Sequence, residues 1–271
     1  MKSVLISKRW LTLFVAVSFL CRPALGGPVP EAPPLSASEI VQKAVARSGQ
    51  PIPSGKSDYI YTKVSVTEEL DATGKVKERQ ERVYQVSFHE GCSSLKLIEV
   101  NGKPPGEADR KKQTENETNI RQLLAGSKTA RADRRENLLT HELVNRYDFK
   151  LIGQAMVNGR ATYKLRFQVK NPEPAVHHVI DRLLNRLSGT LWIDAEEFEV
   201  ARADIYLGSE VNLLGGIIGS LKKLAFTVNR TRLPEGIWFN SSSSGDFEGR
   251  KLLDSTRIKT RSQSINFRPL G

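Results

Sequence analysis

The chain has 271 residues and a formal net charge of +11 at neutral pH, with 39% apolar and 7% aromatic residues. This length suits one β-rich domain, and a modest positive charge with few aromatic residues does not indicate a nucleic-acid-binding protein. The two cysteines are Cys21 and Cys92. Cys21 belongs to a predicted leader, so Cys92 would have no partner for an internal disulfide and the fold must depend on its core.

Residues 1–26 have the three-part pattern of a secretory signal peptide. Basic residues come first, an apolar run extends from Leu11 to Cys21, and Ala24 and Gly26 fit the −3 and −1 positions of a cleavage site. The apolar run has eleven residues, whereas a membrane-spanning helix needs about 20. We therefore predict a soluble exported protein that does not span the membrane and resides in the periplasm, with secretion as the alternative.

Residues 27–56 are expected to form a linker and an N-terminal helix. Five of the nine residues 27–35 are proline or glycine, which is typical of a linker. Ser36 and Glu39 have the spacing of a capping box and predict the start of a helix. The apolar side of this helix consists of Ile40, Val41, Ala44 and Val45. The main domain is predicted to extend over residues 57–271.

Three antiparallel strands are predicted at the start of this domain, over residues 59–69, 75–89 and 95–100. The first strand alternates two kinds of residue, with Ile60, Thr62 and Val64 on one face. An Asp-Ala-Thr-Gly turn at residues 71–74 separates it from the second strand. This arrangement predicts a meander.

Residues 107–148 form a charged insertion that is poor in aromatic residues. Leu123 and Leu124 belong to one weak helical stripe, and Leu139, Leu143 and Tyr147 form another at a spacing of four. We expect two helices interrupted near residue 126, which lie over the sheet or beside it with a solvated charged face.

The segment from residue 149 to residue 206 carries the clearest pattern. Asn158-Gly159 suits a type I′ turn, and the strand after it alternates strictly between apolar and polar residues. A second hairpin is predicted from strands at residues 189–194 and 198–206. Between the hairpins, residues 176–187 have a helical apolar stripe, with Gly189 expected as the C-cap glycine.

The stretch Val211–Leu221 is apolar and contains three glycines. It predicts either a short buried helix or an apolar flap that controls entry to a cavity, and the two interpretations are about equally supported. A hairpin is then expected from strands at residues 225–233 and 237–241, followed by a last long strand over residues 250–267. The total is about ten strands, a number at which a sheet curls.

No catalytic or metal-binding pattern is found in the sequence. It contains no HExxH, CxxC or G-x-S-x-G motif, and its four histidines do not have ligand spacing. We therefore predict no catalytic residues, no metal ligands, no cofactor and no enzyme activity. Asp194 is expected to accept hydrogen bonds in a turn. Arg257, Lys259 and Arg261 share one strand face, which we interpret as solvated outer surface, with an anionic lipid or an acidic partner as the second interpretation.

The two hairpins carry a resemblance to a known family. Asn158-Gly159-Arg160 with Tyr163 and Leu165, followed by Leu191-Trp192-Ile193-Asp194, resembles a motif of the periplasmic lipoprotein-carrier superfamily. This superfamily comprises LolA- and LolB-like proteins, outer-membrane lipoprotein-sorting proteins and RseB-like sensors. The resemblance covers roughly residues 57–267 and implies an unclosed barrel of about eleven strands, with helices over an apolar cavity that takes acyl chains. The charged insertion is longer than a plain carrier needs, and no cargo-binding residue can be matched one for one.

The expected fold is therefore α+β, a curved antiparallel sheet of 10–11 strands that forms an unclosed half-barrel covered by helices. The predicted function is non-catalytic binding of a lipid, an acyl chain or a lipidated protein, and the protein is expected to be a monomer. The alternative is a regulatory or structural module with a self-filled cavity and a protein partner in the cell envelope. The residues predicted to line the cavity or its lid are Trp192, Trp238, Phe167, Leu165, Leu183, Leu187, Leu213, Leu214, Ile217 and Ile218.

Overall fold

The computed structural model describes residues 35–50, 59–89, 92–124, 139–212, 219–251 and 254–269. The chain divides into residues 1–34 and residues 35–271, and the fold described below is that of the second unit. The predicted leader, the middle of the charged insertion (125–138) and the centre of the apolar stretch (213–218) lie outside the described residues.

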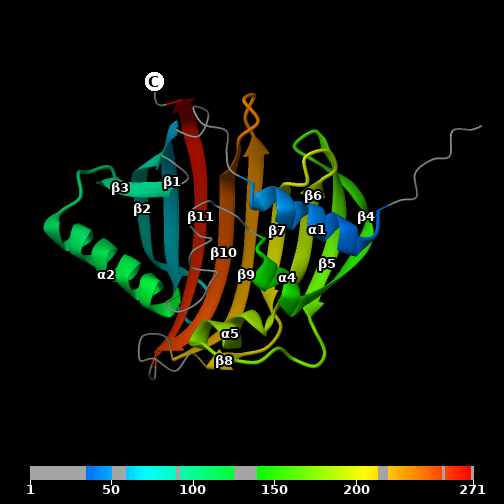
Figure 1. Ribbon diagram of the computed structural model, residues 1–271. Coiled ribbons are helices and arrows are strands. Elements are labelled where there is room, and N and C mark those ends of the chain that lie inside the picture. Colours follow the sequence, from blue (N-terminus) through cyan, green and yellow to red (C-terminus); the bar gives the residue numbers. More distant parts are fainter. Residues whose placement is uncertain are drawn as a thin grey trace, which may run out of the picture. The chain divides into compact units, whose positions relative to one another are not determined.

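The second unit is built on one antiparallel sheet with four described helices (Figure 1). The strands are β1 (Tyr59–Leu70), β2 (Val76–His89), β3 (Cys92–Val100), β4 (Tyr147–Val157), β5 (Arg160–Val169), β6 (Leu187–Asp194), β7 (Val200–Leu207), β8 (Val211–Asn212), β9 (Ser220–Arg232), β10 (Trp238–Lys251) and β11 (Asp254–Pro269). The helices are α1 (Ala37–Ser48), α2 (Glu107–Leu124), α4 (His141–Arg146) and α5 (Val179–Leu184).

The strand order is β3-β2-β1-β11-β10-β9-β7-β6-β5-β4, with β8 paired to β9. In the part of the chain that the structure describes, the end strands β3 and β4 do not pair with each other, so the 11-stranded sheet is open. The expected α+β half-barrel is thus confirmed. The first and last strands of the chain, β1 and β11, are neighbours inside the sheet, third and fourth in this order.

The first predicted hairpin is confirmed as β4 and β5. Asn158 and Gly159 have φ values of 50° and 77°, as both central positions of a type I′ turn require. The second hairpin is confirmed as β6 and β7, although β6 begins at Leu187, two residues before the predicted start. Asp194 accepts hydrogen bonds from the backbone amides of Glu196 and Glu197 at 3.1 and 2.9 Å, as expected of a turn residue.

The prediction of a helix over residues 176–187 is wrong in its length and in the residue expected to end the helix. It is the six-residue α5 (Val179–Leu184), and Gly189 lies inside β6 rather than at a helix C-cap. A Cβ built on Gly189 would lie 2.0 Å from the Asp204 carbonyl oxygen and 2.8 Å from the Phe167 ring. Glycine is therefore required for close packing between strands and not for ending a helix.

The C-terminal strands also differ from the prediction. β10 continues to Lys251, and the last strand is β11, which starts at Asp254. The serine-rich part of β10 was not expected in a strand, yet β9 and β11 pair with it on both sides. The hydroxyl oxygens of Ser243 and Ser262 lie 2.7 Å apart across this pairing. Tertiary pairing has overridden a weak local preference.

The charged insertion contains α2, most of whose described side chains are exposed, and the short α4. Thr140 caps α4 by accepting a hydrogen bond from the Leu143 amide at 3.2 Å. Tyr147, which the spacing placed in a helix, is the first residue of β4. α2 approaches α5, whereas α1 crosses in front of the β5–β7 part of the sheet (Figure 1).

The main core lies between α1 and the half of the sheet that contains β4–β7. Ser36 and Glu39 form the predicted capping box, in which the Ser36 amide donates to Glu39 Oε2 at 2.8 Å. The buried residues of this core are Ile40, Val41, Ala44, Val45, Leu139, Tyr147, Leu165, Phe167, Leu191, Ile193, Val200 and Ala203. We call the sheet face that α1 covers the inner face, and the opposite one the outer face.

Candidate functional site

Apolar side chains continue along the inner face beyond the core under α1. Ala203 belongs to this core and Ile205 packs against it, so both lie on the inner face of β7. Residues paired across antiparallel strands share a face, and Ile205 pairs with Phe226 of β9. Leu224 is two residues from Phe226 and therefore lies on the same face.

The same pairing extends this face to two further strands. Leu224 pairs with Phe247 of β10, and Phe247 pairs with Ile258 of β11. We call these five residues the inner strip: Ile205, Leu224, Phe226, Phe247 and Ile258. All five are partly buried, and four of them belong to neither core cluster of the described residues.

The aromatic residues of the inner strip lie close together. The ring centroids of Phe226 and Phe247 are 6.3 Å apart. The Phe247 ring also folds over Gly245, where an added Cβ would lie 2.3 Å from it. The absence of a side chain at residue 245 thus leaves the space that the ring occupies. The result is a continuous apolar surface across β7, β9, β10 and β11, suited to contact with an aliphatic chain.

The predicted cavity residues on β5 lie in the core instead of lining an open surface. Leu165 is 0% exposed and Phe167 is 6% exposed, and both pack with α1 in the main core. The Phe167 ring meets the Tyr147 ring edge-on at 5.2 Å. Leu183 on α5 and Leu187 at the start of β6 are partly buried. α1 occupies the inner face where a ligand was expected to contact Leu165 and Phe167.

The two predicted tryptophans lie in separate polar surroundings. Trp238 is 7% exposed, and its Nε1 donates to Glu197 Oε2 at 2.7 Å. The Arg160 guanidinium lies 5.8 Å from the Trp238 ring centroid. Trp192 alternates with the core residues Leu191 and Ile193, so it lies on the outer face. The sequence pattern placed both indole rings with the apolar residues because it carries no information about these charged partners.

The predicted residues Leu213, Leu214, Ile217 and Ile218 lie outside the described residues, and so does most of the expected flap. Sequence reasoning missed the inner strip. The alternation of Leu224, Phe226 and Val228 was a signal for part of it, since these residues are two apart in one strand. Phe247 gave no such signal, because it falls in a stretch of serine and glycine that was not predicted as a strand.

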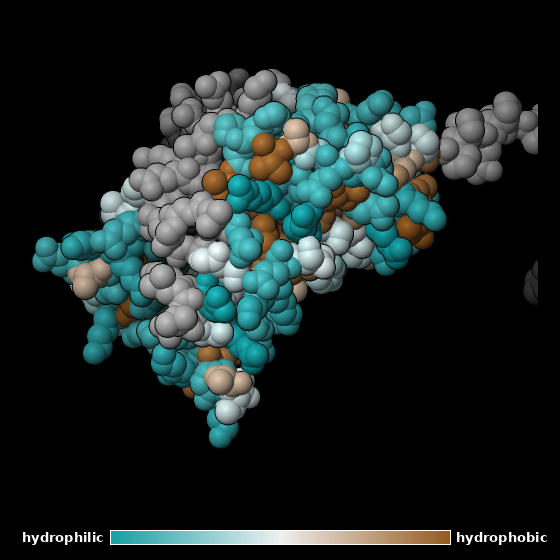
Figure 2. All heavy atoms as spheres, turned by 90° about the horizontal axis from the view of Figure 1, so that it is seen from below, coloured by the Kyte–Doolittle hydropathy of each residue, from teal (hydrophilic) through white to brown (hydrophobic). Residues whose placement is uncertain are grey.

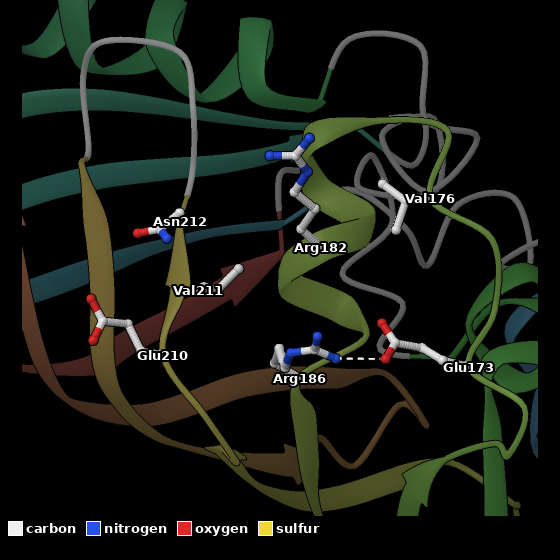
Figure 3. Close-up of a pocket in the computed structure, with 7 residues that line it drawn as sticks. All are labelled: Glu173, Val176, Arg182, Arg186, Glu210, Val211 and Asn212. Carbon is white, nitrogen blue, oxygen red and sulfur yellow. Dashed lines mark hydrogen bonds and ion pairs between the residues drawn. The ribbon is translucent and has the colours of Figure 1, made fainter.

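A pocket lies at the end of the interior strands β6 and β7, where α5 precedes β6 and β8 follows β7 (Figure 3). Its volume is about 230 Å³, and its lining residues are Glu173, Val176, Arg182, Arg186, Glu210, Val211 and Asn212. Arg186 and Glu173 form an ion pair at 2.8 Å. Figure 3 shows Arg182 and Glu210 on different walls, one on α5 and one beside β8.

The pocket suits a small polar group rather than a whole amphiphile. Pockets for drug-sized ligands have volumes of about 300–1,000 Å³, and this one is smaller and carries charges of both signs. Viewed from below, this end of the unit shows polar surface with several separate apolar patches (Figure 2). The pocket is thus lined mainly by charged and polar side chains, and the surface around it combines polar and apolar patches.

Buried polar contacts fix the α5 wall of this pocket. Asp181 is 1% exposed, pairs with Arg146 and accepts hydrogen bonds from the backbone amides of His177 and His178, both at 2.8 Å. Burial acts to raise the pKa of Asp181, but the two amides and the Arg146 charge outweigh it and hold this pKa below its ordinary value. Asn185 joins the same network by accepting from Arg146 Nη1 at 2.9 Å.

The motif residues that carry the family resemblance have a structural role. Arg160 binds Asp194 through two hydrogen bonds of 2.6 and 2.9 Å, which join the first hairpin to the second. Burial acts to raise the pKa of Asp194, yet the hydrogen bonds from Arg160 and from the Glu197 and Glu196 amides lower it overall. The Arg160 pKa is raised in turn, chiefly by its hydrogen bonds to Asp194.

No group of three or more His, Cys, Asp or Glu side chains in the described ranges is placed to hold a metal ion. None of the described helices has the length and apolar character needed to cross a bilayer.

No protein-family model matches the chain, and no curated protein matches it either. Similar solved structures include a protein domain from Vibrio parahaemolyticus described as outer membrane lipoprotein-sorting, with 14% identity and a TM-score of 0.42 over 86% of this chain and 92% of that one. A LolA superfamily protein from Nitrosomonas europaea has 13% identity and a TM-score of 0.37 over 88% and 95% of the two chains. The MucA/MucB complex of Pseudomonas aeruginosa has 11% identity and a TM-score of 0.25 over 87% and 99%. At these identities and TM-scores the matches assign neither a family nor a function to the chain.

Proposed function

We propose that the protein is a non-catalytic, exported binding protein that takes the acyl chain of a lipid or of a lipidated protein on the inner strip. The observation that carries this proposal is the continuation of apolar side chains across β7, β9, β10 and β11, beyond the core that α1 covers. The predicted signal peptide supports placement in the periplasm, where such a cargo would be met.

The physical reason is the transfer of apolar surface from water. Fully burying a side chain such as Phe or Leu is worth roughly 1.5–3 kcal/mol. The side chains of the inner strip are only partly buried in the protein itself. An aliphatic chain laid along Leu224, Phe226 and Phe247 would complete their burial and cover its own surface at the same time.

Displacement of a fluorescent fatty-acid probe tests the proposal. The exported protein should bind the probe, and a double substitution Phe226→Ala with Phe247→Ala should weaken binding roughly tenfold to a hundredfold, the equivalent of one buried aromatic contact. Tyr206→Ala is the matched control, because Tyr206 follows Ile205 on the outer face and is 47% exposed. Absence of probe binding, or an equal loss in the control, would reject the proposal.

The second candidate is a regulatory or structural module that binds a protein of the cell envelope. α2 supports it, because most of the described side chains along this helix are exposed and many are charged. Crosslinking in the intact envelope distinguishes the two candidates. A specific protein partner attached through α2, together with no lipid in native mass spectra, would favour the module over the lipid-binding protein.

A further inference from the structure

Cations gather on the outer face of the same half of the sheet whose inner face is covered by α1. Lys150 lies between Phe149 and Leu151 on β4, and both of these residues pack against the main core. Lys150 therefore points to the outer face. By the same alternation, Lys164 and Arg166 on β5 lie on the outer face because Leu165 between them is in the core.

The strand register brings these cations together around one tryptophan. Lys150 pairs with Arg166, and Lys164 pairs with Trp192 of β6. The Lys164 ammonium nitrogen lies 5.3 Å from the centroid of the Trp192 ring. We call Lys150, Lys164, Arg166 and Trp192 the cationic patch. Its members come from three adjacent strands, so they form an array on the sheet surface and not a single charged loop.

Arg202, on the neighbouring strand β7, contacts the ring of Trp192 opposite β5. Its guanidinium carbon lies 5.0 Å from the Trp192 ring centroid, and the same side chain is ion-paired with Asp204 at 2.9 Å. Asp204 also accepts a hydrogen bond from Thr227 at 2.9 Å. Trp192 is thus fixed in orientation on the outer face while part of its surface stays accessible.

Over the described ranges, no ion pair involves Lys150, Lys164 or Arg166, and Lys150 and Arg166 are exposed. The basic residues of β11 differ, since Arg257 pairs with Glu248 at 3.4 Å and Arg261 with Glu68 at 3.3 Å. Two of the three cations of the β11 stripe are therefore ion-paired, whereas none of the three cations of the patch is ion-paired within the described residues.

We propose that the cationic patch docks the protein on a membrane surface that contains anionic phospholipid. Lysine and arginine have long flexible stems that carry their charge to the headgroups, and each contributes favourably near an anionic surface. A tryptophan with an apolar body and a polar N–H is suited to the same interfacial layer. The lysines act as hydrated point charges, which favours a diffuse array of headgroups over one defined acidic peptide. This proposal does not depend on acyl-chain binding at the inner strip.

Cosedimentation with vesicles tests it at low ionic strength. Protein purified in its exported form should bind vesicles of phosphatidylcholine with phosphatidylglycerol and should not bind phosphatidylcholine alone. The triple variant Lys150→Gln, Lys164→Gln and Arg166→Gln should bind on the order of a hundredfold more weakly. The reason is that each cation near an anionic surface raises the affinity about fivefold. Binding should also put the Trp192 ring into a less polar layer, which appears as a blue shift of tryptophan emission that Trp192→Phe abolishes.

The matched control removes the same charge elsewhere. Arg110, Lys111 and Lys112 of α2 are exposed, so their triple replacement by Gln also lowers the net charge by three. An equal loss in this control would show that net charge and not the patch drives binding, and would overturn the proposal. Equal binding to both vesicle types, or binding to a soluble acidic peptide and to neither vesicle, would overturn it as well. Should the patch triple variant fail to fold, the exposed single variant Lys150→Glu applies the same test.

Discussion

At the residue scale, Gly189 is required by its neighbours. Replacing it with alanine would place a Cβ 2.0 Å from a backbone oxygen of β7 and against the Phe167 ring, which fills the space above it. We expect Gly189→Ala to lower the free energy of unfolding by about 3 kcal/mol or more, since overpacking against backbone cannot be relieved by a rotamer change. Urea unfolding of the variant measures this loss.

Gly49→Ala provides the control for that measurement. Gly49 has a φ of −82°, and its added Cβ would meet atoms no closer than 3.6 Å, an ordinary contact. Its stability should change little. A similar loss in both variants would contradict the packing role of Gly189.

The buried pair of Arg146 and Asp181 should make stability depend on acid pH. The pKa of Asp181 is held below its ordinary value of 3.8, so its contribution is complete above that value and is lost as the pH falls through the folded-state pKa. Arg146→Met leaves a buried carboxylate unpaired and should cost about 3–5 kcal/mol at pH 7. The difference from the unmodified protein should shrink when unfolding is measured near pH 3, because protonation then removes the unpaired charge.

Arg182→Met is the control for Arg146→Met, since Arg182 is an exposed arginine of α5, the helix that contains Asp181. We expect its effect at pH 7 to be within about 0.5 kcal/mol. A pH-independent loss in Arg146→Met would show that lost packing, and not the Asp181 charge, explains its effect.

At the scale of single elements, α1 can be tested through its cap. The Ser36 hydroxyl accepts a hydrogen bond from the Glu39 amide at 3.3 Å, and Ser36→Ala should lower stability by about 1 kcal/mol. Because α1 supplies four residues to the main core, fraying should increase hydrogen exchange over its first turn. Gln42→Ala, an exposed change in the same helix, should leave both measurements nearly unaltered.

The same scale explains which elements the sequence predicts. The capping box of α1 and the Asn158-Gly159 turn are local, because the residues that specify them are within a few positions of one another. α5 was predicted too long because Leu187 continues a helical apolar spacing although it pairs in β6. β10 was predicted too short because its serine-rich part depends on β9 and β11, which its own sequence does not encode. The inner strip was missed for that reason, since it exists only when four strands are aligned.

At the scale of the second unit, our proposals assign acyl-chain binding to one face of the sheet and membrane docking to the other. The inner face combines a core under α1 with the inner strip, and the outer face carries the cationic patch. Alternation along each strand makes this separation automatic, since neighbouring residues of β5 and β6 point to opposite faces. Substitutions of the inner strip and of the patch should therefore act independently.

The pairing of β1 with β11 determines when folding can finish. Tyr59 pairs with Pro269, so among the described strands β1–β3 join the rest of the sheet only through the last strand of the chain. Contacts between residues so distant in sequence form slowly, because a long loop must close before they are made. During synthesis the sheet stays incomplete until β11 has emerged. A late-closing sheet of this kind would keep a chain that we predict to be exported from reaching its final fold before it crosses the membrane.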